Sequence, residues 1–238
     1  MKVAVISANF GGYEVVAPWP EQVVPAGVSV EINRFDDQNF PGRHLAMTSR
    51  LKCGIPKWFG PEIVPGYDAY LWVDASRGLA PDTVAWFLDR LGRADLVAFL
   101  HPERRTIREE YEFVKTRMAR PGETYLTSRY AGEWLDAQFS AVSKPWHRDD
   151  RLYATTAFLY RPTVPVQRAF KDVFGMKARY ILHDQLAFPF CLREHRVHVA
   201  ELPDNIYTLP QLPITRVKTK RMVPRHDVPM SREHGSPW

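Results

Sequence analysis

The chain has 238 residues, of which 45% are hydrophobic, so it can bury one sizeable core. No long linker divides it into two comparable domains, and polar residues and glycines interrupt its apolar opening far short of a signal peptide or a membrane span. Its formal net charge of +5 and pI near 9.2 favour polyanionic partners, which include nucleotide phosphates and nucleic acid.

Basic residues and prolines gather after residue 213, where six Lys and Arg side chains outnumber two acids. We therefore expect one domain over 1–213 and a basic, proline-containing tail over 214–238, the segment where partial disorder is expected first. The two cysteines, Cys53 and Cys191, have neither CxxC nor metal-ligand spacing. This pattern predicts free thiols in a reducing cytoplasm, and no membrane partner is expected.

Apolar runs of two periodicities alternate along the chain. Short β-branched and aromatic runs predict strands at 3–7, 28–35, 69–73, 95–100 and 152–160. Helical spacing predicts helices at 43–53, 81–91, 105–118, 123–139, 166–174 and 184–193, the first of them ended by Gly54 and Pro56. This alternation predicts a single α/β, Rossmann-like domain whose mainly parallel, twisted sheet carries helices on both faces.

Several predicted strands end in glycine or polar residues, and ligands of open α/β sheets bind outside such carboxyl ends. The first exit holds Asn9, Gly11 and Gly12, where glycine would let the backbone approach a nucleotide closely. The GxGxxG fingerprint is absent, which argues against a dinucleotide-dependent oxidoreductase. A tight turn without a ligand is the alternative for this exit, and Asp36 follows the second strand.

Asp74 follows a run of bulky apolar residues and precedes small ones, so its carboxylate is expected at the edge of the sheet. There it could bind a hard divalent cation, Mg²⁺ or Mn²⁺, or a ribose hydroxyl. A cation bridging a diphosphate would neutralise the charge that develops on a leaving nucleoside diphosphate. A helix cap or turn is the alternative role. Ser76 stands where a second acid is often found, which leaves the metal motif incomplete.

Cationic and acidic side chains elsewhere could complete a site. Arg50 and Lys52 lie on a predicted helix and could clamp diphosphate oxygens, although solvated surface charges are the alternative. His101 and Arg104 follow another strand, with the same alternative. Asp184 opens a predicted helix together with Gln185, and it acts either as a helix cap or as the carboxylate that faces the acceptor.

The order of these segments resembles the GT-A glycosyltransferase-like family related to plant mucilage and turgor-regulation proteins. The match covers most of residues 1–195. Its motifs are, in chain order, Gly11-Gly12-Tyr13, Phe35-Asp36-Asp37, Arg50 and Lys52 with Pro56, the run from Tyr70 to Ser76, the run from His101 to Arg104 with Ile107 and Glu109-Glu110, and Asp184-Gln185-Leu186 with Phe188. Each motif is weak alone, but six in the same order make coincidence improbable.

The resemblance implies a GT-A fold and transfer of a sugar from a nucleotide-sugar donor. It places several residues at the donor, namely Gly11, Gly12 and Asp36 in the nucleotide pocket and Arg50 and Lys52 near the diphosphate. It makes Asp74 the metal-binding acid. Asp184 and Gln185 are similar to an Asp-Gln pair that some retaining GT-A enzymes keep beside the reacting sugar. His101 and Arg104 belong to a family motif of unassigned role.

The chain also departs from the family pattern. Thr106 and Arg108 stand where the family usually has Cys and Tyr. The third metal ligand, often a late histidine in GT-A enzymes, could be His198 or His226, and no spacing selects either. Metal dependence therefore stays open at the level of the sequence.

Two hypotheses follow. The first is a glycosyltransferase whose acceptor is a glycan, a small molecule or a modified DNA base, with the basic tail and interspersed aromatic residues favouring nucleic acid. The second is a catalytically inactive GT-A-fold protein that binds a nucleotide or nucleic acid. The single acid of the motif around Asp74 is the feature that favours this alternative.

Overall fold

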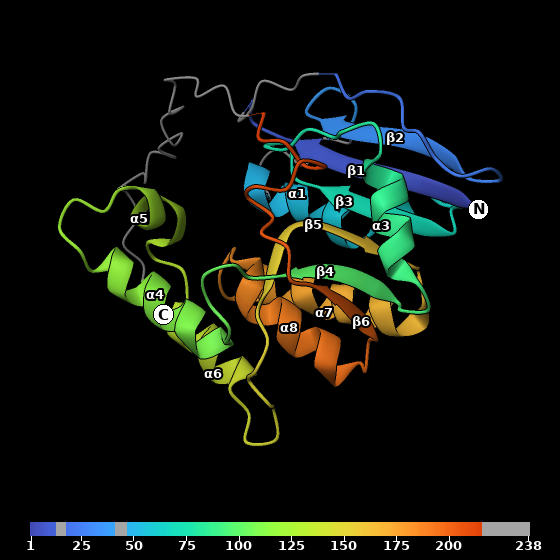
Figure 1. Cartoon of the computed structure of the whole chain (residues 1–238). Helices are drawn as coiled ribbons and strands as arrows, with labels where there is room; N and C mark the ends of the chain where they lie inside the picture. Colours follow the sequence, from blue (N-terminus) through green and yellow to red (C-terminus); the bar gives the residue numbers. More distant parts are fainter. Residues whose placement is uncertain (13–17, 41–46, 216–238) are drawn as a thin grey trace.

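The computed structural model describes residues 1–12, 18–40 and 47–215, and a six-stranded sheet in the order β2-β1-β3-β5-β4-β6 lies at its centre (Figure 1). The strands are β1 (Lys2–Asn9), β2 (Ser29–Asp36), β3 (Ala69–Val73), β4 (Leu96–Leu100), β5 (Tyr153–Tyr160) and β6 (Val199–Leu202). Only β5 runs against its neighbours, β3 and β4, and all other pairs are parallel. The predicted mainly parallel sheet is thereby confirmed.

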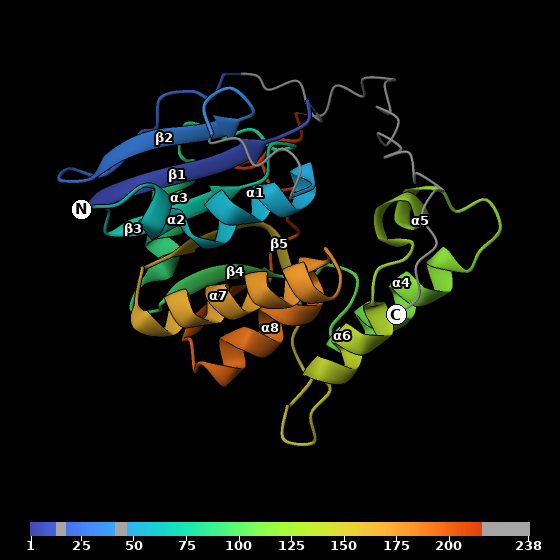
Figure 2. The same cartoon turned by 180° about the vertical axis from the view of Figure 1, so that it is seen from behind.

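Helices cover both faces of the sheet, as predicted, and a further group of helices lies beyond the carboxyl ends of the parallel strands. The helices are α1 (Ser49–Trp58), α2 (Gly60–Ile63), α3 (Thr83–Leu91), α4 (Ile107–Met118), α5 (Tyr125–Tyr130), α6 (Leu135–Val142), α7 (Val164–Arg179) and α8 (Asp184–Glu194). Figures 1 and 2 show α3 on one face and α1, α7 and α8 on the other. In both views α4, α5 and α6 stand at the end where the parallel strands finish.

The core has two layers because successive residues of a strand point to opposite faces. On the face of α1, α7 and α8, Ile6, Trp72 and Phe158 pack with the helical residues Trp58 and Phe170. The rings of Trp58 and Phe158 stack with centroids 5.4 Å apart. Strands buried on both sides read as continuous apolar runs, which is why they could be located from the sequence.

The first predicted helix is displaced in the structure: α1 covers Ser49–Trp58 rather than 43–53. It begins where the Thr48 side chain accepts a hydrogen bond from the Leu51 amide, and Gly54 and Pro56 lie inside it. Gly54 serves close packing, because a Cβ there would lie 3.1 Å from the ring of Phe174. Residues 41–46 lie outside the described residues.

Other boundaries also differ from prediction. The single helix expected at 123–139 is divided into α5 and α6, because Gly132 adopts a left-handed φ of +79° between them. The short α2 and the edge strand β6 were not predicted. Within the described ranges, no helix is long and apolar enough to cross a lipid bilayer.

Candidate functional site

A cavity of about 580 Å³ opens at the carboxyl edge of the sheet, between the strand ends and helices α4 and α5. Eight of the residues predicted for the site line it: Asn9, Arg50, Asp74, Ser76, His101, Arg104, Asp184 and Gln185. They come from segments far apart in the chain, and the parallel arrangement of β1, β3 and β4 brings those segments together. The lining also includes Tyr207 and Ile214, from the segment that follows β6.

Asp74 lies directly after β3, and its carboxylate reaches the cavity. Its amide donates to the Thr156 carbonyl at 2.8 Å, and its Oδ1 accepts a hydrogen bond from Nε1 of Trp72 at 2.8 Å. The side chain keeps 37% of its exposure. Asp82 occupies the N-cap position of α3, so Asp74 is not a helix cap, but its carbonyl accepts from the Arg77 amide at 2.9 Å and closes a turn, the other part of that alternative.

Asp184, the first residue of α8, is held between two buried lysines. Its Oδ2 lies 2.8 Å from Nζ of Lys57 on α1, and its Oδ1 lies 2.8 Å from Nζ of Lys177 on α7. Nζ of Lys57 is also 3.7 Å from Oδ1 of Asp74. The three helices on one face of the sheet therefore meet in a single charged network at the cavity wall.

The network shifts the protonation equilibria of its members. Burial alone would raise the pKa of Asp184, but the charges of Lys177 and Lys57 outweigh it and hold the pKa far below its usual range. Burial opposes the charge of Lys57, yet Asp184 and Asp74 raise its pKa. The pKa of Asp74 is raised, first by burial and against the opposing charge of Lys57. Asp74 is thus the better proton acceptor of the two carboxylates.

A second network joins α4 to the start of α8. Glu110 is buried, and its Oε1 lies 2.7 Å from Nε2 of His183, while its Oε2 accepts from Nε of Arg104. Nδ1 of His183 lies 3.0 Å from the hydroxyl of Tyr130 on α5. Burial would raise the Glu110 pKa, but His183 and Arg104 lower it to about 2. The carboxylate stays ionised and fixes both partners at the cavity.

His101, predicted from the sequence, belongs to the same region. Its Nδ1 accepts hydrogen bonds from the amides of Glu103 and Arg104 at 3.2 and 3.1 Å, which closes the turn after β4. Burial first, and then the charge of Arg104, lowers the His101 pKa. His101 therefore has a structural role beside the cavity, because its neutral imidazole shapes this turn.

Two arginines of the lining have no carboxylate within ion-pair distance among the described residues. Arg50 donates from Nη1 to the carbonyl of Arg129 at 2.8 Å, and its guanidinium lies 5.0 Å from the ring centroid of Tyr130. Arg129 donates from Nη1 to the hydroxyl of Tyr125 and lies over that ring. Their charges are therefore uncompensated by any acid that the structure describes.

Four predicted donor residues lie outside the cavity lining. Gly11 and Gly12 have φ angles of +76° and +63°, and the Gly11 amide donates to Oδ2 of Asp37 at 2.6 Å. Oδ1 of Asp37 lies 3.1 Å from the buried Nζ of Lys52. Asp36 closes its own turn, where Oδ1 accepts from the amides of Gln38 and Asn39. The roles predicted for these four residues stay predictions.

The expected divalent cation fits the described residues poorly. Both oxygens of Asp184 are bound to ammonium groups, and Oδ1 of Asp74 is bound to the indole of Trp72. Over the described ranges, no three His, Cys, Asp or Glu side chains are grouped so as to hold a metal. His198 directly precedes β6 and so lies at the amino ends of the parallel strands, where its amide donates to Oδ2 of Asp95. Asp74 lies at the carboxyl ends, so the prediction of His198 as a metal ligand beside Asp74 is wrong. His226 lies outside the described residues.

Five charged residues of the described lining were given no site role from the sequence: Lys57, Arg77, Glu110, Arg129 and Lys177. A signal for two of them exists. Lys177 continues the buried stripe of α7, four residues after Val173, and Glu110 lies between the buried Ile107 and Val114 of α4. An ionisable residue on the apolar stripe of a helix needs a buried partner, which marks it as a candidate site residue.

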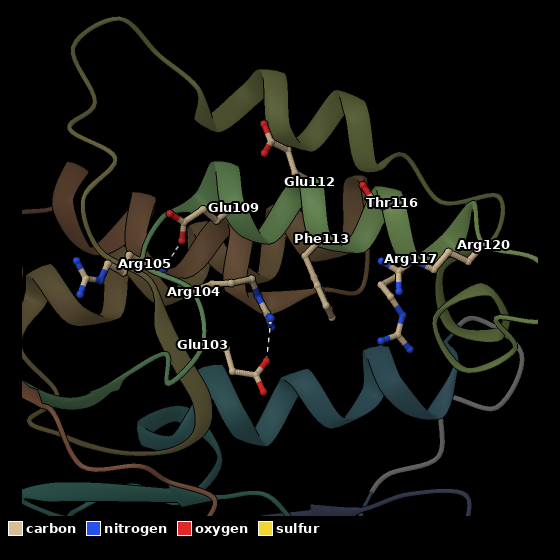
Figure 3. Close-up of a pocket in the computed structure, with 9 residues that line it drawn as sticks. All are labelled: Glu103, Arg104, Arg105, Glu109, Glu112, Phe113, Thr116, Arg117 and Arg120. Atoms are coloured by element: carbon tan, nitrogen blue, oxygen red, sulfur yellow. Dashed lines mark hydrogen bonds and ion pairs between the residues drawn. The ribbon is translucent and has the colours of Figure 1, made fainter.

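A second, shallower hollow of about 660 Å³ lies on α4 beside the cavity and shares Arg104 and Phe113 with it (Figure 3). Figure 3 shows Phe113 projecting from α4 between Arg104 and Arg117, whose guanidinium carbons lie 3.9 and 5.7 Å from the ring centroid. Arg117 is itself paired with Glu123. Arg104 and Phe113 thus contribute to the walls of both the hollow and the cavity.

No protein-family model matches the sequence, and no curated protein matches it either. Among solved structures, the apo bifunctional glycosyltransferase WbbM aligns with 84% of this chain at 14% identity and a TM-score of 0.47, and the chain spans 38% of the length of WbbM. A glycosyltransferase involved in glycosylation of the major capsid of PBCV-1 aligns over 84% of this chain and 81% of its own, at 9% identity and a TM-score of 0.45. Mouse xyloside xylosyltransferase 1, in its apo form, aligns over 85% of both chains at 8% identity and a TM-score of 0.46. Similarity at this level identifies no family, donor or acceptor for this chain.

Proposed function

We propose that this protein is a glycosyltransferase that moves a sugar from a nucleotide-sugar donor to a hydroxyl or amine of an acceptor. The observation that carries the proposal is the charge of the cavity. Its described lining holds six cationic side chains, Arg50, Lys57, Arg77, Arg104, Arg129 and Lys177, against three acids, Asp74, Glu110 and Asp184. A concave site with excess positive charge suits a diphosphate, and its one accessible acid suits a proton transfer.

In this proposal the bond between the anomeric carbon and the diphosphate oxygen breaks, and the nucleoside diphosphate leaves with the bonding electrons. The acceptor atom forms the new bond to the anomeric carbon and loses its proton to Asp74. The raised pKa of Asp74 fits this role, because a stronger base removes a proton more readily. Asp184 acts as a positioning residue that fixes Lys57 and Lys177, and Gln185 offers an amide to sugar hydroxyls.

The experiment is a screen of the purified protein against a panel of nucleotide sugars, with release of nucleoside diphosphate as the readout. We expect release with at least one donor, and a loss of about 10²- to 10⁴-fold in Asp74→Asn, since a positioned general base contributes that much. Asp89→Asn on the exposed surface of α3 is the matched control. Full activity in Asp74→Asn would refute the assignment.

The acceptor is proposed to be a modified base of DNA or a glycan, and the two make different predictions. If the acceptor is DNA, the protein should bind DNA, and this binding should weaken as the salt concentration rises, because neutralising phosphates releases counterions. Removing the residues beyond Ile214, which include the basic tail, should then weaken retention without loss of donor-dependent nucleoside diphosphate release. Retention that does not change with salt or truncation would favour the glycan.

One observation favours the alternative of a binding protein without catalysis. Both oxygens of Asp184, the second carboxylate expected at the reacting sugar, are committed to lysines. A protein of this kind would bind nucleotide sugars in calorimetry yet release no nucleoside diphosphate over long incubation with any acceptor. Release that depends on Asp74 would exclude it.

A further inference from the structure

Resting on the proposed function, we infer that the donor diphosphate is held by a pair of protein arginines, Arg50 and Arg129, and needs no divalent cation. The inference combines two observations of the same cavity. Its acids are already bound to protein groups, and two of its cations lack an acidic partner among the described residues.

The three acids of the described lining leave little room for a metal ion. Each oxygen of Asp184 accepts from a lysine at 2.8 Å, and the two oxygens of Glu110 bind His183 and Arg104. Only Oδ2 of Asp74 has no hydrogen-bond partner in the described structure, because Oδ1 accepts from Trp72. A magnesium or manganese ion needs several oxygen ligands from protein, substrate and water, and one carboxylate oxygen is a weak anchor.

In contrast to these acids, Arg50 and Arg129 have no ion-pair partner among the described residues. Arg50 is the second residue of α1, a helix with no acid in its first turn, and Arg129 is near the end of α5. The hydrogen bond from Arg50 to the Arg129 carbonyl ties the two segments together in the lining of the cavity. Each guanidinium has five N–H donors, and the described contacts use one donor on each.

Guanidinium groups match phosphate oxygens in geometry and stay charged at any physiological pH. The aromatic rings of Tyr130 and Tyr125 hold the two groups at 5.0 and 4.5 Å from their centroids, which orders them before a ligand binds. Two ordered, uncompensated guanidinium groups can supply the positive charge that a bridging metal ion would otherwise bring. The segment of α5 thereby becomes part of the donor site, a role that the sequence does not indicate.

The test is calorimetric binding of UDP, GDP and dTDP to the full chain, first in EDTA and then with manganese chloride. We expect at least one nucleoside diphosphate to bind in EDTA, with an affinity that manganese changes less than about threefold. Arg50→Gln and Arg129→Gln should each weaken binding about tenfold to hundredfold, the range for a lost hydrogen bond to a charged group. Arg129→Lys should recover part of the loss, because it restores the charge without the planar fork.

Arg93→Gln is the matched control, since Arg93 is exposed in the turn before β4, at the amino ends of the parallel strands and away from the cavity. Unchanged thermal unfolding of each variant separates a lost contact from a lost fold. Binding that occurs only with manganese would overturn the inference and leave the proposed function standing. Metal-independent binding unaffected by either arginine variant would overturn the residue assignment. No binding under either condition would overturn both the inference and the proposed function.

Discussion

Nζ of Lys57 lies 2.8 Å from Oδ2 of Asp184, and this ion pair connects α1 to α8 across 127 positions of the sequence. Both side chains are almost fully buried, at 5% and 11% exposure. Lys177 binds the other oxygen of Asp184, so removing this one carboxylate would leave two buried ammonium groups without their main partner. The charged wall of the cavity therefore depends on Asp184 more than on any other acid described in it.

The first prediction concerns stability. Asp184→Asn should lower the free energy of unfolding by about 3 to 5 kcal/mol, the range for breaking a buried ion pair from one side. Urea denaturation at neutral pH measures it. Lys177→Met should cost less, because Asp184 keeps Lys57 and no buried charge is left alone. Equal losses in the two variants would show that packing, not charge, sets the effect.

The second prediction concerns the loss of stability at acidic pH. The pKa of Glu110 is about 2 in the folded protein and 4.5 in its ordinary state, so its stabilisation is complete above pH 4.5 and is lost as the pH falls towards 2. The shift corresponds to roughly 3 kcal/mol. Unfolding free energies measured between pH 5 and pH 3 should fall more steeply for the native chain than for Glu110→Gln. Identical slopes would contradict the role given to Glu110.

The fold and part of the site were predictable, for different physical reasons. The strands buried on both faces are continuous apolar runs, so Ala69–Val73 could be located without ambiguity. Asp74 was found because a polar residue directly after such a run must lie at the edge of the sheet. The edge strand β6 has weaker apolar character, with Val199 and Ala200 only partly buried, and was missed.

The partners of the site residues were not predictable. The ion pairs of Asp184 depend on helices that begin at Ser49 and Val164, and nothing local to Asp184 indicates which lysines its helix will meet. The displaced end of α1, at Trp58 rather than at residue 53, has the same origin. Gly54 and Pro56 resemble a helix end locally, but both lie within α1, where Gly54 packs closely against Phe174. Tertiary contacts, absent from the local pattern, decided both cases.

The third prediction concerns Cys53, which lines the cavity and whose thiol pKa is raised by burial to about 11. Only the thiolate reacts with iodoacetamide, so alkylation of the folded protein should be slow at pH 8 and rise about tenfold per pH unit up to pH 10. Peptide mass spectrometry distinguishes Cys53 from Cys191. The same chain in urea provides the control, where both thiols should react faster. Equal rates with and without urea would contradict the raised pKa of the Cys53 thiol in the folded protein.

The location of the donor is tested most directly by a crystal structure of the protein soaked with a nucleoside diphosphate that binds in calorimetry. We predict that its diphosphate lies in the cavity at the carboxyl edge of the sheet, within reach of Arg50 and Asp74. An ordered nucleotide bound elsewhere, such as in the hollow on α4, with the cavity containing only water, would contradict the proposal that this cavity is the donor site.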